Sequence, residues 1–148
     1  MTPYNLACDL VEFIKARLKE TEEKPYNVFV GFLPIALSKA EQKEFCPAII
    51  VRPVEIADGE DETTATIGVY ITDYDDDRYY RAESILHITE FLRFELLTNN
   101  PVVMKYNIQK GSMVTTIPDE QPYPQVWAAI HFDVNLPQPK RNFNGVFL

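Results

Sequence analysis

Three aspartates at alternate positions, Asp73, Asp75 and Asp77, are the residues of this sequence whose spacing could bind a metal. The same spacing supplies the first ligands of the calcium loop of an EF-hand. That loop also needs a glycine and a bidentate glutamate, at positions where this sequence has Arg78 and Ser84. We therefore interpret the acids as the start of a helix, where free backbone N–H groups favour negative charge, and predict no metal site.

Other side chains that serve in catalysis are few and scattered. His87 and His131 are the only histidines, and neither belongs to a metal-ligand motif such as H-E-x-x-H. Nothing in the sequence suggests a base that would activate Cys8 or Cys46 as a nucleophile. The five glycines are dispersed, so no phosphate-binding loop is predicted. The sequence predicts neither an enzyme nor a cofactor.

The chain is organised around one stretch, Thr64–Asn100, which predicts a strand followed by a long helix. Its first ten residues alternate apolar and polar, as in a half-buried strand. The helix is predicted over Arg78–Thr98, because Asn99, Asn100 and a proline follow it. At about 100° per residue, one face of this helix gathers Ala82, Ile85, Ile88, Leu92 and Leu96, and the other gathers Tyr80, His87, Phe91 and Phe94.

The rest of the chain predicts an α+β domain, an antiparallel sheet with an N-terminal helix and the long central helix packed on it. The N-terminal helix is expected over Tyr4–Glu20, and a short helical turn over Ser38–Phe45. Strands are expected over Val28–Leu33, Ala48–Ile56 and Gln125–Leu136, with Pro53 at a bulge or an edge. A hairpin is expected to pair Val103–Gln109 with Met113–Ile117. Residues 1–139 would form one domain, and residues 140–148 an extended C-terminal arm.

Composition restricts the class of partner. The net charge of −8 argues against a general nucleic-acid or acidic-membrane binder, which would need clustered Lys and Arg. Two cysteines are too few for a disulfide scaffold, so we expect reduced, buried thiols in a cytoplasmic protein. We find no apolar stretch with the length of a signal peptide or a membrane span.

Two features predict contacts with another chain: the second stripe of the long helix, and the apolar end beyond the last prolines. Exposed aromatic patches usually mark interfaces, although a monomer could also fold both features back onto itself. The acidic loop Ala57–Glu62 is expected to be exposed and to join two strands as an antiparallel hairpin. Such a loop is ordinarily just solvated, but it could line a rim or a lumen if the protein forms a ring. The predicted interface residues are Tyr80, Phe91, Phe94, Lys140, Arg141, Phe143 and Phe147, and the predicted rim residues are Glu60, Asp61 and Glu62.

The ordered features of residues 2–139 resemble the tail terminator, or tail completion, proteins of long-tailed bacteriophages. The likeness lies in the amphipathic first helix, the strand CPAIIVRPVEI, the acidic loop ADGEDE, the segment TIGVYITDYDDD, the helix YRAESILHITEFLRFELLTNNPV and the late strand PYPQVWAAIHFDVNLP. The family has no strict residue motif, so no site residue carries over from it.

This resemblance implies a virion protein that is assembled in the bacterial cytoplasm. It would form a homohexameric ring on the head-proximal end of the tail tube, stop tube growth and provide the docking surface for the head connector. It would also meet the sheath where the tail is contractile, and DNA would pass through its lumen without specific binding. No catalytic residues would be present. Two alternatives stay open: an adaptor or chaperone that binds tail or head-completion proteins transiently, and a small Mg²⁺-dependent hydrolase or nuclease that uses Asp75 and Asp77.

Overall fold

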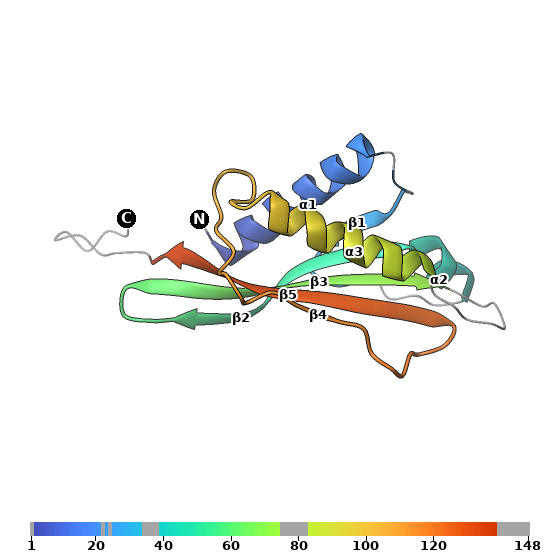
Figure 1. Ribbon diagram of the computed structural model, residues 1–148. Coiled ribbons are helices and arrows are strands. Elements are labelled where there is room, and N and C mark those ends of the chain that lie inside the picture. Colours follow the sequence, from blue (N-terminus) through green and yellow to red (C-terminus); the bar gives the residue numbers. More distant parts are fainter. Residues whose placement is uncertain (1, 22, 24, 34–38, 75–82, 139–148) are drawn as a thin grey trace.

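The computed structural model describes residues 2–21, 23, 25–33, 39–74 and 83–138 of the chain (Figure 1). They form an α+β fold with a five-stranded mixed sheet and three helices. In chain order the elements are α1 (Pro3–Glu20), β1 (Asn27–Val30), α2 (Lys39–Phe45), β2 (Ala48–Asp58), β3 (Glu62–Tyr74), α3 (Glu83–Thr98), β4 (Val114–Thr116) and β5 (Gln125–Pro137).

Helix α1 begins where local chemistry dictates. Pro3 occupies the first turn, and the Thr2 side chain accepts a hydrogen bond from the backbone N–H of Asn5 at 3.1 Å, while the Asn5 side chain accepts one from the Thr2 backbone. Both bonds satisfy N–H groups that a helix start leaves free. The buried face of the helix is the predicted apolar face and contains Leu6, Leu10, Ile14 and Leu18.

The strand order is β1-β2-β3-β5-β4, and the prediction of a wholly antiparallel sheet is wrong at one edge. β1 pairs with β2 in the parallel direction, whereas the other three pairings are antiparallel. A parallel neighbour requires a crossover, and here the crossover includes α2. The sequence signals each element but not the direction in which the chain returns to the sheet.

The central strand β3 pairs along its whole length with β5, from Glu62 opposite Pro137 to Tyr74 opposite Gln125. Its predicted alternation is confirmed, because the side chains on its helix-facing side are fully buried, namely Ala65, Ile67, Val69 and Ile71. β2 and β3 form the predicted antiparallel hairpin. Their register shifts between Pro53 and Glu55, which confirms the bulge that the proline predicted.

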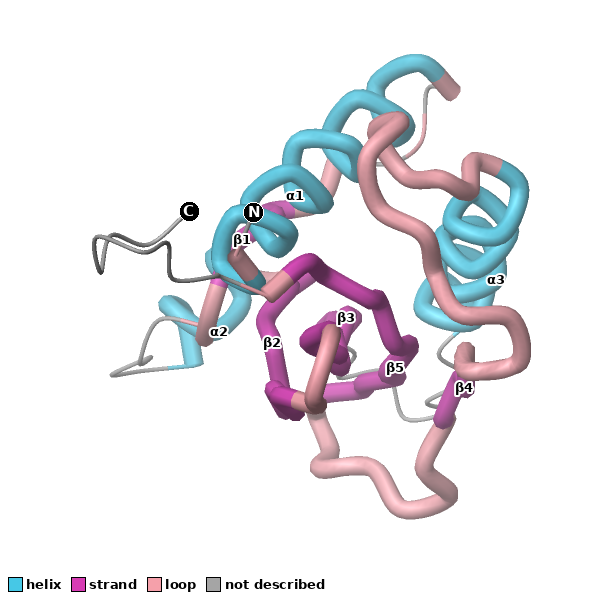
Figure 2. The backbone as a smooth tube through the Cα atoms, turned by 90° about the vertical axis from the view of Figure 1, so that its left-hand side faces the viewer, coloured by secondary structure: helices cyan, strands magenta, loops and turns pink. Residues whose placement is uncertain are grey.

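Helices α1 and α3 lie side by side on the same face of the sheet (Figures 1 and 2). The predicted inner face of α3 is confirmed, because Ile85, Ile88, Leu92 and Leu96 are buried against the strands. Ala82 and the predicted start of this helix at Arg78 lie outside the described residues. Together the two helices and the strands enclose one hydrophobic core.

The predicted hairpin between Val103–Gln109 and Met113–Ile117 is wrong. β4 pairs with β5, and the preceding segment makes only isolated bridges, such as Val102 with Tyr106. Side chains hold this segment in place. The Asn100 amide hydrogen-bonds both backbone groups of Ile108, and the Tyr106 hydroxyl donates to Asp9 at 2.8 Å. These side-chain hydrogen bonds take the place of the backbone hydrogen bonds that a hairpin would have formed.

The packing of α3 predicts unequal costs for two neighbouring substitutions. Ile88 is 1% exposed, whereas Leu86, on the outer side of the same helix, is 40% exposed. We expect Ile88→Ala to lower the free energy of unfolding by about 3 kcal/mol, because it leaves a cavity in the core. Leu86→Ala should change it by less than about 0.5 kcal/mol. Urea denaturation of both variants tests this, and equal losses would contradict the orientation of α3.

Two tyrosines predict a decline in stability at alkaline pH. Burial raises the pKa of Tyr106 to about 12, and the hydrogen bond to Asp9 adds to the rise. Burial likewise raises the pKa of Tyr26 to about 12, with added repulsion from Asp73 and Glu23. The unfolded chain therefore loses these phenolic protons at about pH 10, where the folded chain keeps them. The unfolded state then binds fewer protons, so the stability should fall as the pH rises from about 10 to about 12.

Urea denaturation at several pH values from about 9 to about 11.5 measures this decline, because a free phenol titrates within that range. Tyr106→Phe is the matched variant, since it removes one of the two phenols whose pKa is raised to about 12. Its stability should fall less steeply with pH than that of the unchanged protein. Identical slopes in the two proteins would show that Tyr106 does not contribute.

Candidate interaction surface

The outer side of α3 carries apolar side chains that the core does not cover. Phe94 is 60% exposed and Leu97 is 48% exposed, whereas Phe91 is partly buried and packs against the core. The predicted second stripe is therefore divided: its Phe91 belongs partly to the domain, and its Phe94 faces outward. Exposed apolar side chains that cluster in this way are typical of surfaces that bind other proteins.

An open groove of about 720 Å³ runs between α3 and the β4 side of the sheet. Phe91, Phe94 and Ile117 give it an apolar lining, and Glu90 and Arg93 add one charge of each sign. The other lining residues are His87, Thr89 and Thr115. Val114, on the edge strand β4, is also 58% exposed. We define the α3–β4 surface as this groove together with Leu97.

Two hydroxyl groups buried in the lining of the groove lack a hydrogen-bond partner within the described part of the chain. They belong to Thr89 of α3 and Thr115 of β4. A buried hydroxyl without a partner costs about 1–3 kcal/mol, so such groups are rare in native proteins. The hydrogen-bonding groups buried between α3 and β4 are therefore less completely paired than those beneath α1.

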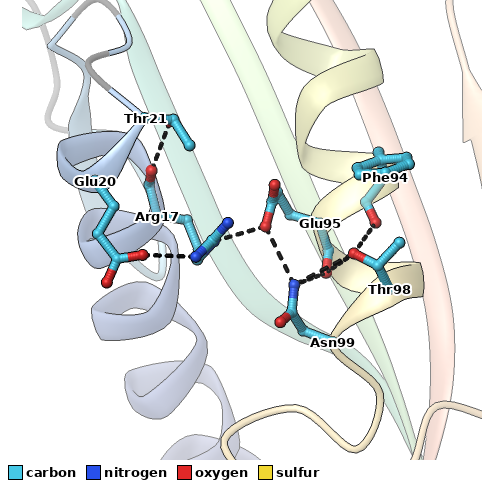
Figure 3. Close-up of polar contacts among 7 residues, drawn as sticks. All are labelled: Arg17, Glu20, Thr21, Phe94, Glu95, Thr98 and Asn99. Carbon is cyan, nitrogen blue, oxygen red and sulfur yellow. Dashed lines mark hydrogen bonds and ion pairs between the residues drawn. The ribbon is translucent and has the colours of Figure 1, made fainter.

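The orientation of α3 is fixed by a polar contact with α1 (Figure 3). The Arg17 Nε donates to the Glu95 carboxylate at 2.6 Å, and the same carboxylate accepts from the Asn99 amide at 3.1 Å. Glu95 is almost completely buried, with 8% of its side chain exposed. The hydrogen bond to Glu95 raises the pKa of Arg17 above its ordinary value, so the guanidinium stays charged.

Because Glu95 is held toward α1, the neighbouring Phe94 must point elsewhere. Successive residues of a helix are rotated by about 100°, so Phe94 is turned away from the Arg17 contact, as Figure 3 shows. The buried ion pair is thus accompanied by a Phe94 side chain that points away from α1. Sequence analysis missed Glu95, since an acid within a helix is ordinarily a solvated residue.

The β2–β3 hairpin projects beyond the ends of the helices (Figure 1). The predicted rim residues Glu60, Asp61 and Glu62 are exposed at its tip, which confirms an exposed acidic loop between two antiparallel strands. Below the tip, Val54 and Ile56 of β2 are 44% and 52% exposed. The hairpin thus carries an acidic end and an apolar stem.

The sheet face opposite α1 and α3 carries an aromatic and cationic cluster that the sequence did not reveal. The Arg52 guanidinium lies 4.1 Å from the ring centre of Tyr70 and 4.5 Å from that of Phe32. The Tyr70 hydroxyl lies 3.1 Å from His131 Nε2, and the two rings meet edge to face. Tyr70 also covers Gly68, where an added Cβ would lie 2.6 Å from the tyrosine ring. Pairing across three strands creates this cluster, so no local pattern marks it.

Several predicted residues fall outside the described part of the chain. These are the interface residues Tyr80, Lys140, Arg141, Phe143 and Phe147 and the aspartates Asp75 and Asp77. Of the acidic run, Asp73 is described, and it lies within strand β3, so its interpretation as part of a helix start is wrong. It is buried, and it accepts hydrogen bonds from the backbone of Tyr74 at 2.7 Å and from Ser84 at 3.3 Å. Within the described residues, no three metal-binding side chains form a cluster.

The two histidines have structural partners. His87 Nε2 lies 3.2 Å from the Glu23 carboxylate, near the end of α1, and His131 lies beside Tyr70. Neither contact involves a thiol or a serine hydroxyl that could act as a nucleophile.

No protein-family model matches the sequence, and no curated protein matches it with significance. Among the helices that the structure describes, none combines the length and the apolar character needed to cross a membrane.

The unpartnered hydroxyl of Thr89 generates a prediction. Thr89→Val replaces the hydroxyl with a methyl group of similar size, and we expect it to raise the free energy of unfolding by about 1 kcal/mol. Thr98→Val is the matched control on the same helix, because the Thr98 hydroxyl donates to the Phe94 carbonyl at 2.9 Å. The control should be neutral or destabilising. Thermal and urea unfolding measure both, and a less stable Thr89→Val would show that this hydroxyl has a partner.

Proposed function

We propose that the protein is a structural component of a bacteriophage or prophage tail, which acts by assembly and not by catalysis. The observation that carries the proposal is the α3–β4 surface, where exposed Phe94 and Ile117 line an apolar groove and exposed Leu97 lies on the same helix. Leaving such side chains in water has no benefit for a free domain. Their exposure is explained if another protein covers them in the assembled state.

The particular component that we propose is the tail terminator, since the order of elements resembles that family over residues 2–139. In this role the protein forms a homohexameric ring that caps the head-proximal end of the tail tube. Its partners are the tube protein, the head connector and, in a contractile tail, the sheath. The net charge of −8 supports a lumen that DNA crosses without binding.

Three parts of the chain receive separate roles in this proposal. The outer side of α3, with Phe91 and Phe94, contacts a neighbouring subunit or the tube. The acidic hairpin tip at Glu60–Glu62 faces a rim or the lumen of the ring. The arm at residues 140–148, which lies outside the described residues, reaches a neighbour or the tube through its basic and aromatic side chains.

A substitution at the centre of the surface tests the proposal. We expect Phe94→Asp to leave the free energy of unfolding within about 0.5 kcal/mol of the unchanged protein, because the side chain is 60% exposed. Binding to the tube protein, or assembly with other copies, should weaken tenfold or more, as expected at an aromatic contact residue. Tyr4→Asp is the matched control, since Tyr4 is 64% exposed on α1, away from the groove.

Light scattering with and without tube protein measures assembly, and calorimetry measures affinity for the tube protein. Equal assembly and equal affinity of Phe94→Asp and Tyr4→Asp would show that the α3–β4 surface does not contact a partner. A protein that stays monomeric at every concentration, alone and with tube protein, would contradict the ring. Assembly factors that bind only transiently are distinguished by their absence from purified particles.

A further inference from the structure

Among the strand edges that no other described segment pairs, two lie at opposite sides of the sheet. β1 pairs with β2 only over Ala48–Val51, so the outer edge of β2 from Val54 to Asp58 is open among the described residues. On the other side, β4 is the last strand, and its outer edge is open in the same sense. Open strand edges offer backbone N–H and C=O groups for pairing with another chain.

The two edges carry opposite charge. Residues 52–62, which include the open part of β2 and the hairpin tip, contain five acids and one arginine. Residues 99–117, which lead into β4, contain Lys105, Lys110 and no acid. Lys105 lies 3.8 Å from Asp9, whereas Lys110 forms no ion pair with any described residue. Like edges would repel each other, and unlike edges attract.

The direction of the strands permits the unlike edges to join. β2 and β4 run in opposite directions, because β2, β3, β5 and β4 are each antiparallel to the next. If a second copy is rotated about an axis that runs along the strands, its β4 lies antiparallel to β2 of the first copy. The sheet then continues from one copy to the next. Contacts between two different surfaces are head to tail. They close into a ring when the rotation between copies closes, and otherwise they extend into a filament.

The same arrangement brings apolar side chains of the two copies together beside the paired strands. Ile56 projects on the helix side of the sheet, since it pairs with buried Ala65, and Thr115 projects on that side too, since it pairs with buried Ile130. Placing Ile56 opposite Thr115 brings the exposed Val54 toward the exposed Ile117 beside the groove. It also brings Ala57 opposite Val114, and the hairpin tip at Asp61 toward Lys110.

We propose that the open edge of β2 (Val54–Asp58) of one copy pairs antiparallel with β4 (Val114–Thr116) of a second copy, with the acidic hairpin tip beside Lys110 of that copy. The occupant of the β4 edge and the adjoining groove is thus a second copy of this chain. This inference rests on the proposed ring and identifies the surfaces that would form it. The acids at Glu55 and Asp58 oppose a β2–β2 pairing, so the contact is heterologous.

Cysteine cross-linking in the full-length chain tests the pairing. The background is Cys8→Ser, because Cys8 is partly exposed, while Cys46 is buried and is retained. In this background the double variant Ala57→Cys with Val114→Cys should form a ladder of disulfide-linked species under mild oxidation. Each single variant should remain uncross-linked at the same concentration, because a head-to-tail contact never places identical residues together.

A second pair, Glu55→Cys with Val114→Cys, covers a slip of two residues, which keeps the same faces of the strands together. Ladders from either pair support the proposal. Absence of a ladder from both pairs overturns it, and so do cross-linked dimers from a single variant, which would show a twofold contact.

Charge exchange gives an independent measurement. Lys110→Glu should weaken association of copies tenfold or more by light scattering, and addition of Asp61→Lys should restore a large part of the loss. Lys15→Glu, an exposed lysine on α1, is the control and should leave association unchanged. Lack of any effect of Lys110→Glu overturns the placement of the hairpin tip.

The outcomes separate this inference from the proposed function. A ring by light scattering without ladders leaves the tail terminator possible but removes this interface. Ladders in a protein that does not bind tail tube protein support this interface and contradict the tail assignment. A chain that stays monomeric and uncross-linked contradicts both.

Discussion

The structure depends on the pairing of one long strand, β3, with neighbours on both sides over most of its length. β3 is paired with β5 from Glu62 to Tyr74 and with β2 from Thr63 to Thr72. Its alternation places every second side chain beneath α1 and α3, and a slip of one residue would turn all of these side chains to the other face. The register of β3 therefore fixes both the core and the composition of the opposite face.

The same constraint produces the features that are available for contacts. β2, β3 and β5 extend farther than β1 and β4, so the hairpin arm stands outside the helix layer and the outer strands leave open edges. On the helix side, the buried contact between Arg17 and Glu95 holds α3 in one orientation and leaves Phe94 exposed. A stable domain and an apolar surface are thus two results of one arrangement, which agrees with a protein that works by assembly.

Local signals explain why much of the fold was predictable. The alternation at Ala65–Ile71, the apolar face of α1 and the bulge at Pro53 each follow from neighbouring residues in the chain. The direction of β1 and the partner of β4 were not predictable, because both depend on the route that the chain takes between elements. The expected hairpin of Val103–Gln109 with Met113–Ile117 failed for that reason. Tyr106 anchors its segment to Asp9, which is distant in sequence, and Asn100 anchors it to Ile108.

The candidate surface shows the same division. The sequence by itself determined that α3 has a second apolar side and that an acidic loop joins β2 to β3, because helical and strand periodicity decide which side chains share a face. Only the tertiary structure decided that Phe91 is partly buried while Phe94 is exposed, and that β4 lies beside them. Burial is set by what packs against a face. That depends on contacts between residues far apart in the chain, which periodicity does not encode.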